Sequence, residues 1–358
     1  MKVVYFGSYD PSYARVRITI KALRGVGISV IECNNSNKNK ILRLYFLSRD
    51  LFSVISDVDC IIVSAAGQSY VFVAKIFSIF FRKPLVFDAF ISYFHVLVRD
   101  LKKFKPFSIY GIYFFCLDFL SCFFSDLVIL DTSEHMHYFH EVFHIPFKKL
   151  CFIPVGSDNE IYYPRKMKQH EAIKIFCVSS FYPLHGMKYI VDAAYKLTLR
   201  NDATFTFIVI GDGPLKLETI DVAKKLKLKN IQFYDVVSPE KLAEIMADMD
   251  ICLGQFGDTQ QANLVVPTKI YDACAMKKPI ITARGVAVLS VFSDKRDIIF
   301  CNFADSESII NALYLLKNDA NLMSVISTNA FNIFTERFNI AAIGKRWSVI
   351  LRNLISFV

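Results

Sequence analysis

The sequence predicts an α/β fold with two Rossmann-like domains, each built on a parallel sheet. Short, continuously apolar segments recur along all 358 residues, and segments of helical periodicity separate them. Continuous apolarity is typical of strands that are buried on both faces, as in a parallel sheet covered by helices. The alternation breaks once, between residues 156 and 170, and then restarts. With 54% hydrophobic residues, the chain is also long enough to form two cores.

Six strands are predicted in each half of the chain. Those of the first half are at residues 3–6, 28–31, 60–63, 84–87, 127–130 and 150–153, and those of the second at 173–179, 205–210, 231–234, 251–254, 279–282 and 298–302. The break at 156–170 is rich in Pro, Gly and charge, as domain links often are. We therefore expect an N-terminal domain over residues 1–168, a second domain over 169–335, and a helix over 336–358 that can pack back on the first domain.

No segment is predicted to cross a membrane. The longest runs without Asp, Glu, Lys or Arg are 16 and 15 residues, at 320–335 and 60–74, whereas a spanning helix needs about 20. The aromatic segment 107–130 contains Asp118 and Asp126, which favours a buried helix followed by a strand. The N-terminus resembles a first strand without a signal-peptide cleavage site, and nine cysteines without CxxC spacing fit a reducing compartment. We expect a cytoplasmic protein.

Positive charge is concentrated in the first half. Residues 1–168 hold 21 of the 42 Lys and Arg but only 14 of the 33 Asp and Glu. This asymmetry predicts an anionic partner, and because no nucleic-acid-binding module accompanies it, nucleic acid is not the expected one. Residues 99–105 interleave four cations with Leu101 and Phe104. Such a segment can lie on an anionic bilayer, at the inner face of the membrane, although a solvated loop is the alternative.

The segment 265–279 is predicted to bind an anion. Pro267 and Thr268 favour a helix start, whose free backbone N–H groups and positive dipole end attract phosphate. Lys269 adds a full charge, and Asp272 shares its helix face and could accept hydrogen bonds from sugar hydroxyls. The alternative is an ordinary amphipathic helix with two solvated charges.

A glycine turn precedes this segment. The predicted strand 205–210 runs into Gly211-Asp212-Gly213-Pro214, where glycines let a ligand approach backbone N–H groups. Upstream lies the loop 180–186, and downstream lie the loop 253–257 and the segment 265–279. In this order and spacing, residues 173–283 resemble the donor half of family 4 of the GT-B glycosyltransferases.

The first half resembles the same family more loosely, through Gly7, residues 88–92 and residues 154–156. The resemblance implies two facing Rossmann-like domains, with the donor nucleotide on the second and the acceptor against the first. Family members transfer a sugar from a nucleotide diphosphate with retention and without a bound metal, so no cofactor is expected. The implied donor-binding residues are Gly7, Ser180, Gly211, Gly213, Gly257, Val265, Lys269 and Asp272.

The sequence departs from the family pattern at three positions. Ser180 and His185 occupy places where the family usually has an Arg and a Lys on the diphosphate. Leu264 falls where the first of two family glutamates belongs, and Asp272 matches the second. His185 could still donate to phosphate, either protonated or as a neutral ring. Asp88, His185 and Lys269 are the expected catalytic residues. Asp88 is also a candidate acid–base group because it follows the carboxyl end of a predicted strand, and His95 is a second such candidate.

The predicted function is a retaining glycosyltransferase that moves a sugar from a nucleotide sugar to a glycan, lipid-linked or other envelope acceptor, as in polysaccharide biosynthesis. The alternatives are a nucleotide-sugar epimerase of the same fold and a non-catalytic nucleotide-sugar-binding protein with a decayed donor site. No metal site is predicted. Four histidines could bind zinc, but an exposed helix explains them better: His135, His137, His140 and His144. The Asp-x-Asp motif at 248–250 could also bind a metal, but it is interpreted as the end of a helix before a strand.

Overall fold

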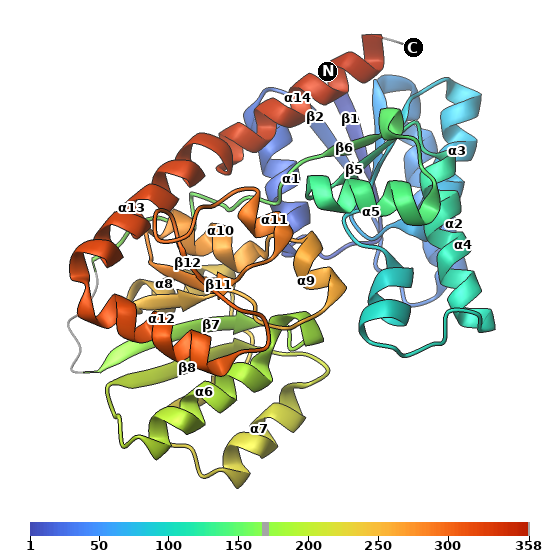
Figure 1. Ribbon diagram of the computed structural model, residues 1–358. Helices are drawn as coiled ribbons and strands as arrows, with labels where there is room; N and C mark the ends of the chain where they lie inside the picture. Colours follow the sequence, from blue (N-terminus) through green and yellow to red (C-terminus); the bar gives the residue numbers. More distant parts are fainter. Residues whose placement is uncertain (167–171, 357–358) are drawn as a thin grey trace. The chain divides into compact units, whose positions relative to one another are not determined.

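The computed structural model describes residues 1–166 and 172–356, and the chain divides into two compact units. The first unit contains Met1–Gly156 and the last helix, which begins at Ile340, and the second contains Ser157–Asn339. Each unit is a six-stranded parallel sheet with helices, which confirms the predicted α/β fold class (Figure 1). The boundary predicted between residues 168 and 169 falls outside the described residues.

The first sheet has the strand order β2-β1-β3-β4-β5-β6, and every neighbouring pair is parallel. Its strands are β1 (Lys2–Gly7), β2 (Ser29–Asn34), β3 (Cys60–Val63), β4 (Leu85–Asp88), β5 (Leu127–Leu130) and β6 (Leu150–Phe152). The strands β3, β4 and β5 are buried along their whole length, as their continuous apolarity predicts. Strand β2 extends further than expected because it lies at the edge of the sheet, where exposed polar positions alternate with buried ones.

Six α-helices belong to the first unit, counted over its described residues. They are α1 (Ala14–Gly25), α2 (Lys40–Val54), α3 (Gln68–Phe81), α4 (Ile109–Phe124), α5 (Ser133–Phe143) and α14 (Ile340–Ser356). Helix α14 packs against α1, and Gly344 lies so close to the Ala22 carbonyl that any side chain there would collide with it. The only tryptophan, Trp347, is fully buried on α14.

The second sheet has the order β12-β11-β10-β7-β8-β9 and is also parallel. Its strands are β7 (Ile173–Ser179), β8 (Phe205–Gly211), β9 (Ile231–Tyr234), β10 (Ile251–Leu253), β11 (Ile280–Ala283) and β12 (Ile299–Cys301). Its helices are α6 (Met187–Leu199), α7 (Lys216–Lys225), α8 (Pro239–Ala247), α9 (Gln260–Leu264), α10 (Thr268–Ala275), α11 (Val286–Leu289), α12 (Ser306–Asn318) and α13 (Ala320–Arg337). Beta strands β10, β7 and β8 are neighbours, so the loops at their carboxyl ends converge.

The Asp-x-Asp motif has the structural role expected of it. Asp248 follows α8 as its C-terminal cap, and the Asp250 carboxylate accepts a hydrogen bond from the Lys174 N–H at 2.7 Å just before β10. The Lys278 ammonium donates to the neighbouring Ala247 and Met249 carbonyls. The motif therefore ends a helix and begins a strand, as interpreted.

The aromatic segment 107–130 differs from the prediction in its exposure. It does form a helix and a strand, α4 and β5, but the outer side of α4 is exposed rather than buried. Ile109, for example, is 85% exposed. Helices of the described residues are all too short or too polar to cross a membrane.

Candidate functional site

The loop that follows β7 holds His185 in a defined tautomer. The Ser179 hydroxyl accepts a hydrogen bond from the Phe181 N–H at 2.9 Å and lies 3.0 Å from His185 Nδ1, to which it donates because Nδ1 already accepts from a backbone N–H and so carries no proton. The Ser180 N–H also donates to His185 Nδ1 at 3.0 Å. With two donors on Nδ1, the ring proton is on Nε2.

Burial lowers the pKa of His185 well below its ordinary value, and the nearby Lys269 ammonium lowers it further. Of the two modes considered for His185, protonated or neutral, this environment favours the neutral ring with an Nε2–H donor. Ser180, an expected donor-binding residue, contributes its backbone N–H to this arrangement. Ser179 was missed, because the sequence gives no sign that its hydroxyl orients a histidine six residues away.

Glycines are required in the loop that follows β8. Gly211 and Gly213 have φ angles of +146° and +154°, which favour glycine. A Cβ on Gly211 would collide with the Ser179 carbonyl, and a Cβ on Gly213 would collide with the Ser180 carbonyl. This loop therefore lies directly against the β7 loop, and that close approach is what requires glycine at both positions.

The loop that follows β10 packs against the loop that carries His185. The Gly257 N–H donates to the Leu184 carbonyl at 3.0 Å, and the Phe256 N–H donates to the His185 carbonyl at 3.3 Å. Gly257, an expected donor-binding residue, thus uses its N–H to fix the loop that carries His185.

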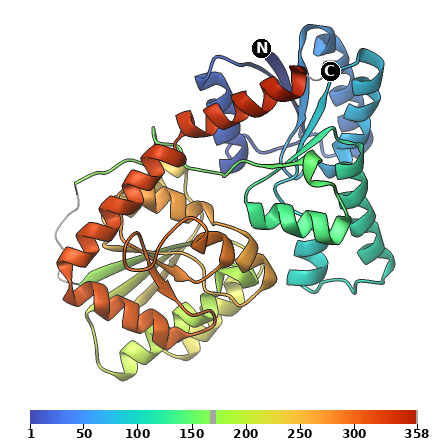
Figure 2. The same ribbon diagram turned by 45° about the horizontal axis from the view of Figure 1, so that its top comes forward.

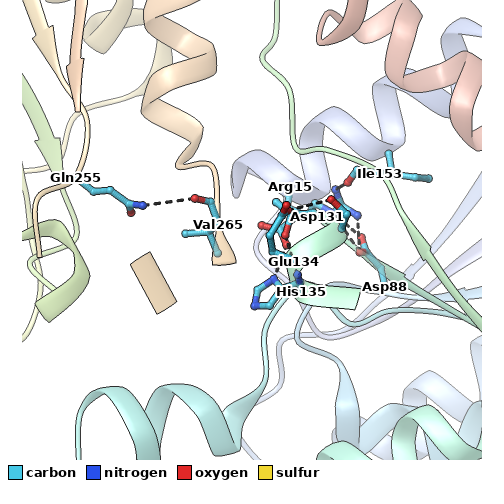
Figure 3. A network of polar contacts seen from close by, with 10 residues as sticks. Arg15, Asp88, Asp131, Glu134, His135, Ile153, Gln255 and Val265 are labelled. Atoms are coloured by element: carbon cyan, nitrogen blue, oxygen red, sulfur yellow. Dashed lines mark hydrogen bonds and ion pairs between the residues drawn. The ribbon is translucent and has the colours of Figure 1, made fainter. Parts of the chain in front are cut away.

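Gln255 is a residue that the sequence analysis missed. It is fully buried, and its side-chain Nε2 donates to the Ala262 carbonyl at 2.8 Å and to the Val265 carbonyl at 3.4 Å (Figure 3). It thereby fixes the expected donor-site residue Val265 at the end of α9. A lone amide in a glycine-containing loop beyond a predicted strand was the signal that could have revealed it.

Lys269 lies in the first turn of α10, as predicted. No side chain caps the start of this helix, and the Ile270 N–H donates to the Pro267 carbonyl at 2.9 Å, so the N–H groups that another acceptor can use are those of Thr268 and Lys269. Lys269 Nζ donates to the Gly254 carbonyl at 3.1 Å, at the end of β10. Burial lowers the pKa of Lys269. The same β10 loop reaches His185, since the Phe256 N–H, two residues after Gly254, donates to the His185 carbonyl. The structure therefore brings Lys269, His185 and the glycine turn to one edge of the second sheet.

Asp272 faces a different partner from Lys269, although it lies on the same helix. Its carboxylate is buried, and Oδ1 accepts a hydrogen bond from the Ser157 hydroxyl at 2.5 Å. Leu264 is partly buried at the end of α9.

In the first unit, Asp88 forms a buried ion pair. Arg15 Nε lies 3.1 and 3.0 Å from the two Asp88 oxygens, a second Arg15 nitrogen lies 2.8 Å from Oδ1, and a third donates to the Ile153 carbonyl at 2.6 Å (Figure 3). Both side chains are essentially inaccessible to solvent. Burial raises the pKa of the Asp88 carboxyl, and the adjacent guanidinium opposes that shift. This geometry favours a structural role for Asp88 and gives its expected catalytic role no support.

Gly7, at the end of β1, belongs to the first unit, and its contact with the donor stays a prediction. Its φ is +148°, and a side chain there would collide with the Ser64 hydroxyl.

His135, His137 and His140 lie on α5, and His144 follows its last residue as the C-terminal cap. His135 Nδ1 lies 2.5 Å from Asp131 Oδ1, whereas His137 and His140 each contact a different backbone carbonyl. Within the described residues, no group of three or more His, Cys, Asp or Glu is placed to hold a metal ion. The expectation of an exposed helix was wrong for His135, which is fully buried because that face of α5 packs into the core.

His95 is a buried neutral histidine rather than an accessible acid–base group. Neither ring nitrogen has a hydrogen-bond partner among the described residues, and the ring lies 4.6 Å from that of Tyr138. Burial lowers its pKa to about 3, with smaller contributions from His135 and Arg99.

This environment predicts a pH-dependent loss of stability. Since the folded pKa lies below the ordinary value, the unfolded chain binds a proton below about pH 6.5 that the folded chain does not bind. Between pH 7.5 and 5.0 the folded state should lose about 2 kcal/mol through this group. His95→Leu should remove that part of the slope. Urea unfolding followed by Trp347 fluorescence measures it, because the only tryptophan lies in the same unit.

The exposed His137 provides the matched control, and His137→Leu should keep the wild-type slope. An unchanged slope in His95→Leu would show that this ring is not the group responsible.

Comparison with known proteins agrees with this geometry. Residues 172–319 match the family model of glycosyl transferases group 1. No curated protein matches the sequence. Among solved structures, Anabaena HepE in complex with UDP and glucose is 17% identical, with a TM-score of 0.75 over 99% of this chain and 100% of that one.

Two further structures extend the likeness. Sucrose-phosphate synthase from Thermosynechococcus elongatus is 12% identical, with a TM-score of 0.76 over 100% of both chains. WaaG, a glycosyltransferase involved in lipopolysaccharide biosynthesis, is 13% identical, with a TM-score of 0.68 over 98% of this chain and 99% of that one. The fold is thus shared over the whole chain, and the family match falls on the unit that holds Lys269 and His185. The chain therefore has the fold of these structures, and its residues 172–319 match the glycosyl transferases group 1.

Proposed function

We propose that the protein is a retaining glycosyltransferase that moves a sugar from a nucleotide diphosphate sugar to a glycan, lipid-linked or other envelope acceptor. The observation that carries this proposal is the convergence of one cation, one neutral N–H donor and an uncapped helix start at the edge of the second sheet. These are Lys269, His185 Nε2 and the first turn of α10. Together they suit a diphosphate better than a neutral ligand.

A UDP-sugar is the donor that we propose first. HepE, which shares the fold, has been solved with UDP and with UDP-glucose. Asp272 is proposed to contact the ribose hydroxyls. Because its carboxylate already accepts from Ser157, a ribose contact would share that carboxylate with the Ser157 hydroxyl.

Lys269 is proposed to stabilise the leaving group. When the bond between the sugar C1 and the diphosphate oxygen breaks, negative charge develops on the diphosphate, and a preorganised cation and helix dipole lower the energy of that state. The acceptor hydroxyl then forms the new bond to C1, and its proton passes to the departing phosphate oxygen. No dedicated protein base is needed in this scheme, which is compatible with the paired state of Asp88.

Incubation with a panel of UDP-, GDP-, ADP- and CMP-sugars separates this function from its two alternatives. A transferase releases the nucleotide and yields a glycoside or free sugar with the donor's anomeric configuration. An epimerase instead returns an epimeric nucleotide sugar. A decayed site, which Leu264 and Ser180 would suggest, binds without turnover. Only the first result, read by chromatography and proton NMR, supports the proposal.

Turnover should be insensitive to a chelator. The charge on the diphosphate can be carried by Lys269, the start of α10 and backbone N–H groups, so a divalent ion is not needed for that task. Nucleotide release measured with and without EDTA should agree within about twofold, a difference of roughly 0.4 kcal/mol. Abolition by EDTA with recovery in Mn²⁺ or Mg²⁺ would require a different site.

A further inference from the structure

The first unit carries an apolar surface at the start of α4. Five side chains between residues 107 and 113 are exposed, from 51% for Ile112 to 94% for Phe107, and we call them the aromatic face: Phe107, Ile109, Tyr110, Ile112 and Tyr113. Ile109, Ile112 and Tyr113 follow helical spacing, so they share one outward side of α4. Contiguous exposed apolar surface of this kind marks an interaction site.

A neighbouring helix, α3, packs against α4. Helices α3 and α4 pack side by side, with the Phe72 and Phe124 rings 6.0 Å apart, and both views of the molecule show them along one flank of the first sheet (Figures 1 and 2). Ile79 and Phe80 on α3 are exposed as well, but they lie away from the aromatic face, because Gln68 at the start of α3 already contacts Asp118 in the second half of α4.

Acidic side chains are missing from the outer side of both helices. Helix α3 contains a single charged residue, Lys75, and α4 contains only Asp118. Asp118 is buried and accepts a hydrogen bond from the Ser92 hydroxyl at 2.7 Å, so its charge faces the core. The aromatic face therefore carries no negative charge of its own.

Three exposed lysines border the aromatic face: Lys102, Lys103 and Lys105. Their segment is folded onto the start of α4, because the Ser108 hydroxyl donates to the Lys105 carbonyl at 2.7 Å. Gly111 allows this contact, since a side chain there would collide with the same carbonyl. The cations are therefore held next to the aromatic face.

The structure corrects which apolar side chains of this region are available. Leu101 and Phe104, expected to dip toward lipid, are only partly exposed. Phe104 instead packs 4.9 Å from the Tyr110 ring and 5.7 Å from the Phe114 ring. The available apolar groups are those of the aromatic face.

We propose that the aromatic face and its three lysines dock this protein on the surface of an anionic lipid bilayer. Aromatic and β-branched side chains would enter the boundary between headgroups and acyl chains, while the lysines contact anionic headgroups. This inference does not rest on the donor site, because binding to lipid needs no nucleotide.

Charge favours a bilayer over a second copy of the chain as the occupant. A two-fold symmetric pair would place the same patch on both sides of the contact. The lysines of one copy would then approach those of the other, and the described residues of α3 and α4 offer no exposed carboxylate to pair with them. An anionic bilayer supplies the opposite charge instead.

Vesicle flotation of the full chain tests the proposal. The wild type should partition at least tenfold more strongly onto vesicles of phosphatidylcholine mixed with phosphatidylglycerol than onto phosphatidylcholine alone. A triple variant of the aromatic face (Phe107→Ser, Ile109→Ser, Tyr110→Ser) should lose at least tenfold. Replacing the three lysines by glutamine should lose at least tenfold on the anionic vesicles only.

Matched controls come from exposed side chains of the second unit. Leu199→Ser, Leu217→Ser and Val236→Ser remove three exposed apolar groups, and Lys224→Gln, Lys225→Gln and Lys227→Gln remove three exposed lysines. Both control sets should stay within twofold of the wild type.

Equal recovery on neutral and anionic vesicles, no recovery at all, or equal losses in the controls would overturn the proposal. Sedimentation without lipid tests whether a second copy of the chain binds to the aromatic face instead. A dimeric wild type that the aromatic-face variant converts to a monomer would assign the face to a second copy and would also overturn it.

Discussion

Lys269→Ala is expected to weaken UDP binding at least tenfold. A charge-assisted hydrogen bond to phosphate typically contributes about 1.5–3 kcal/mol, and the structure places Lys269 in the first turn of α10, where its ammonium donates to the Gly254 carbonyl at the end of β10. The phosphate groups would also lose the positive charge that acts on them together with the positive end of the helix dipole. Isothermal titration calorimetry of the purified wild type and variant measures the change directly.

The control for this substitution is Lys225→Ala. Lys225 is exposed at the end of α7 and lies in the same unit, so it changes net charge equally without touching the proposed site. It should bind UDP like the wild type. An unchanged affinity in a folded Lys269→Ala variant, or an equal loss in Lys225→Ala, would mean that Lys269 does not contact the diphosphate.

Arg15→Met is expected to lower the free energy of unfolding of the first unit by about 3–5 kcal/mol, because it leaves a buried carboxylate without its cation. Asp88→Leu should cost a similar amount, since it strands the guanidinium. The double variant should recover most of the loss, because two apolar side chains need no pairing. Urea unfolding followed by Trp347 fluorescence reports this unit.

An exposed ion pair gives the matched comparison. Lys241 and Glu244 lie 2.9 Å apart on α8 with more than half of each side chain exposed, and Lys241→Met should cost less than about 1 kcal/mol. This change lies in the second unit, so its stability is followed by calorimetry rather than by Trp347. A double Arg15/Asp88 variant that regains stability but has no turnover would show that Asp88 has a catalytic role after all.

The sequence was sufficient for features that depend on neighbouring residues. Continuous apolar runs predicted the buried strands β3, β4 and β5, because a strand covered on both faces needs no polar alternation. The glycine turn after β8 and the start of α10 were recognisable because a turn and a helix start have local signatures. The prediction of the whole site, however, depended on resemblance to a family as well as on the residue pattern.

Contacts between distant residues were not predictable. Arg15 pairs with Asp88 across 73 positions and Ser157 with Asp272 across 115, and no periodicity reveals such partners. The same reason explains His135, whose burial depends on what packs against α5. The aromatic face was predicted as buried because apolar side chains usually are, and only the structure shows that nothing in its own unit covers it.

Calorimetric titration of the wild type with UDP, UMP and uridine tests the central claim most directly, which is that the edge of the second sheet binds a nucleotide diphosphate. Lys269, His185 Nε2–H and the start of α10 should act on the phosphates, so affinity is expected to fall at least tenfold from UDP to UMP and again to uridine, by about 1.4 kcal/mol or more at each step. If UDP bound no more tightly than uridine, or if none of the three bound while GDP, ADP and CMP were also silent, the assignment of this edge as a diphosphate site would be contradicted.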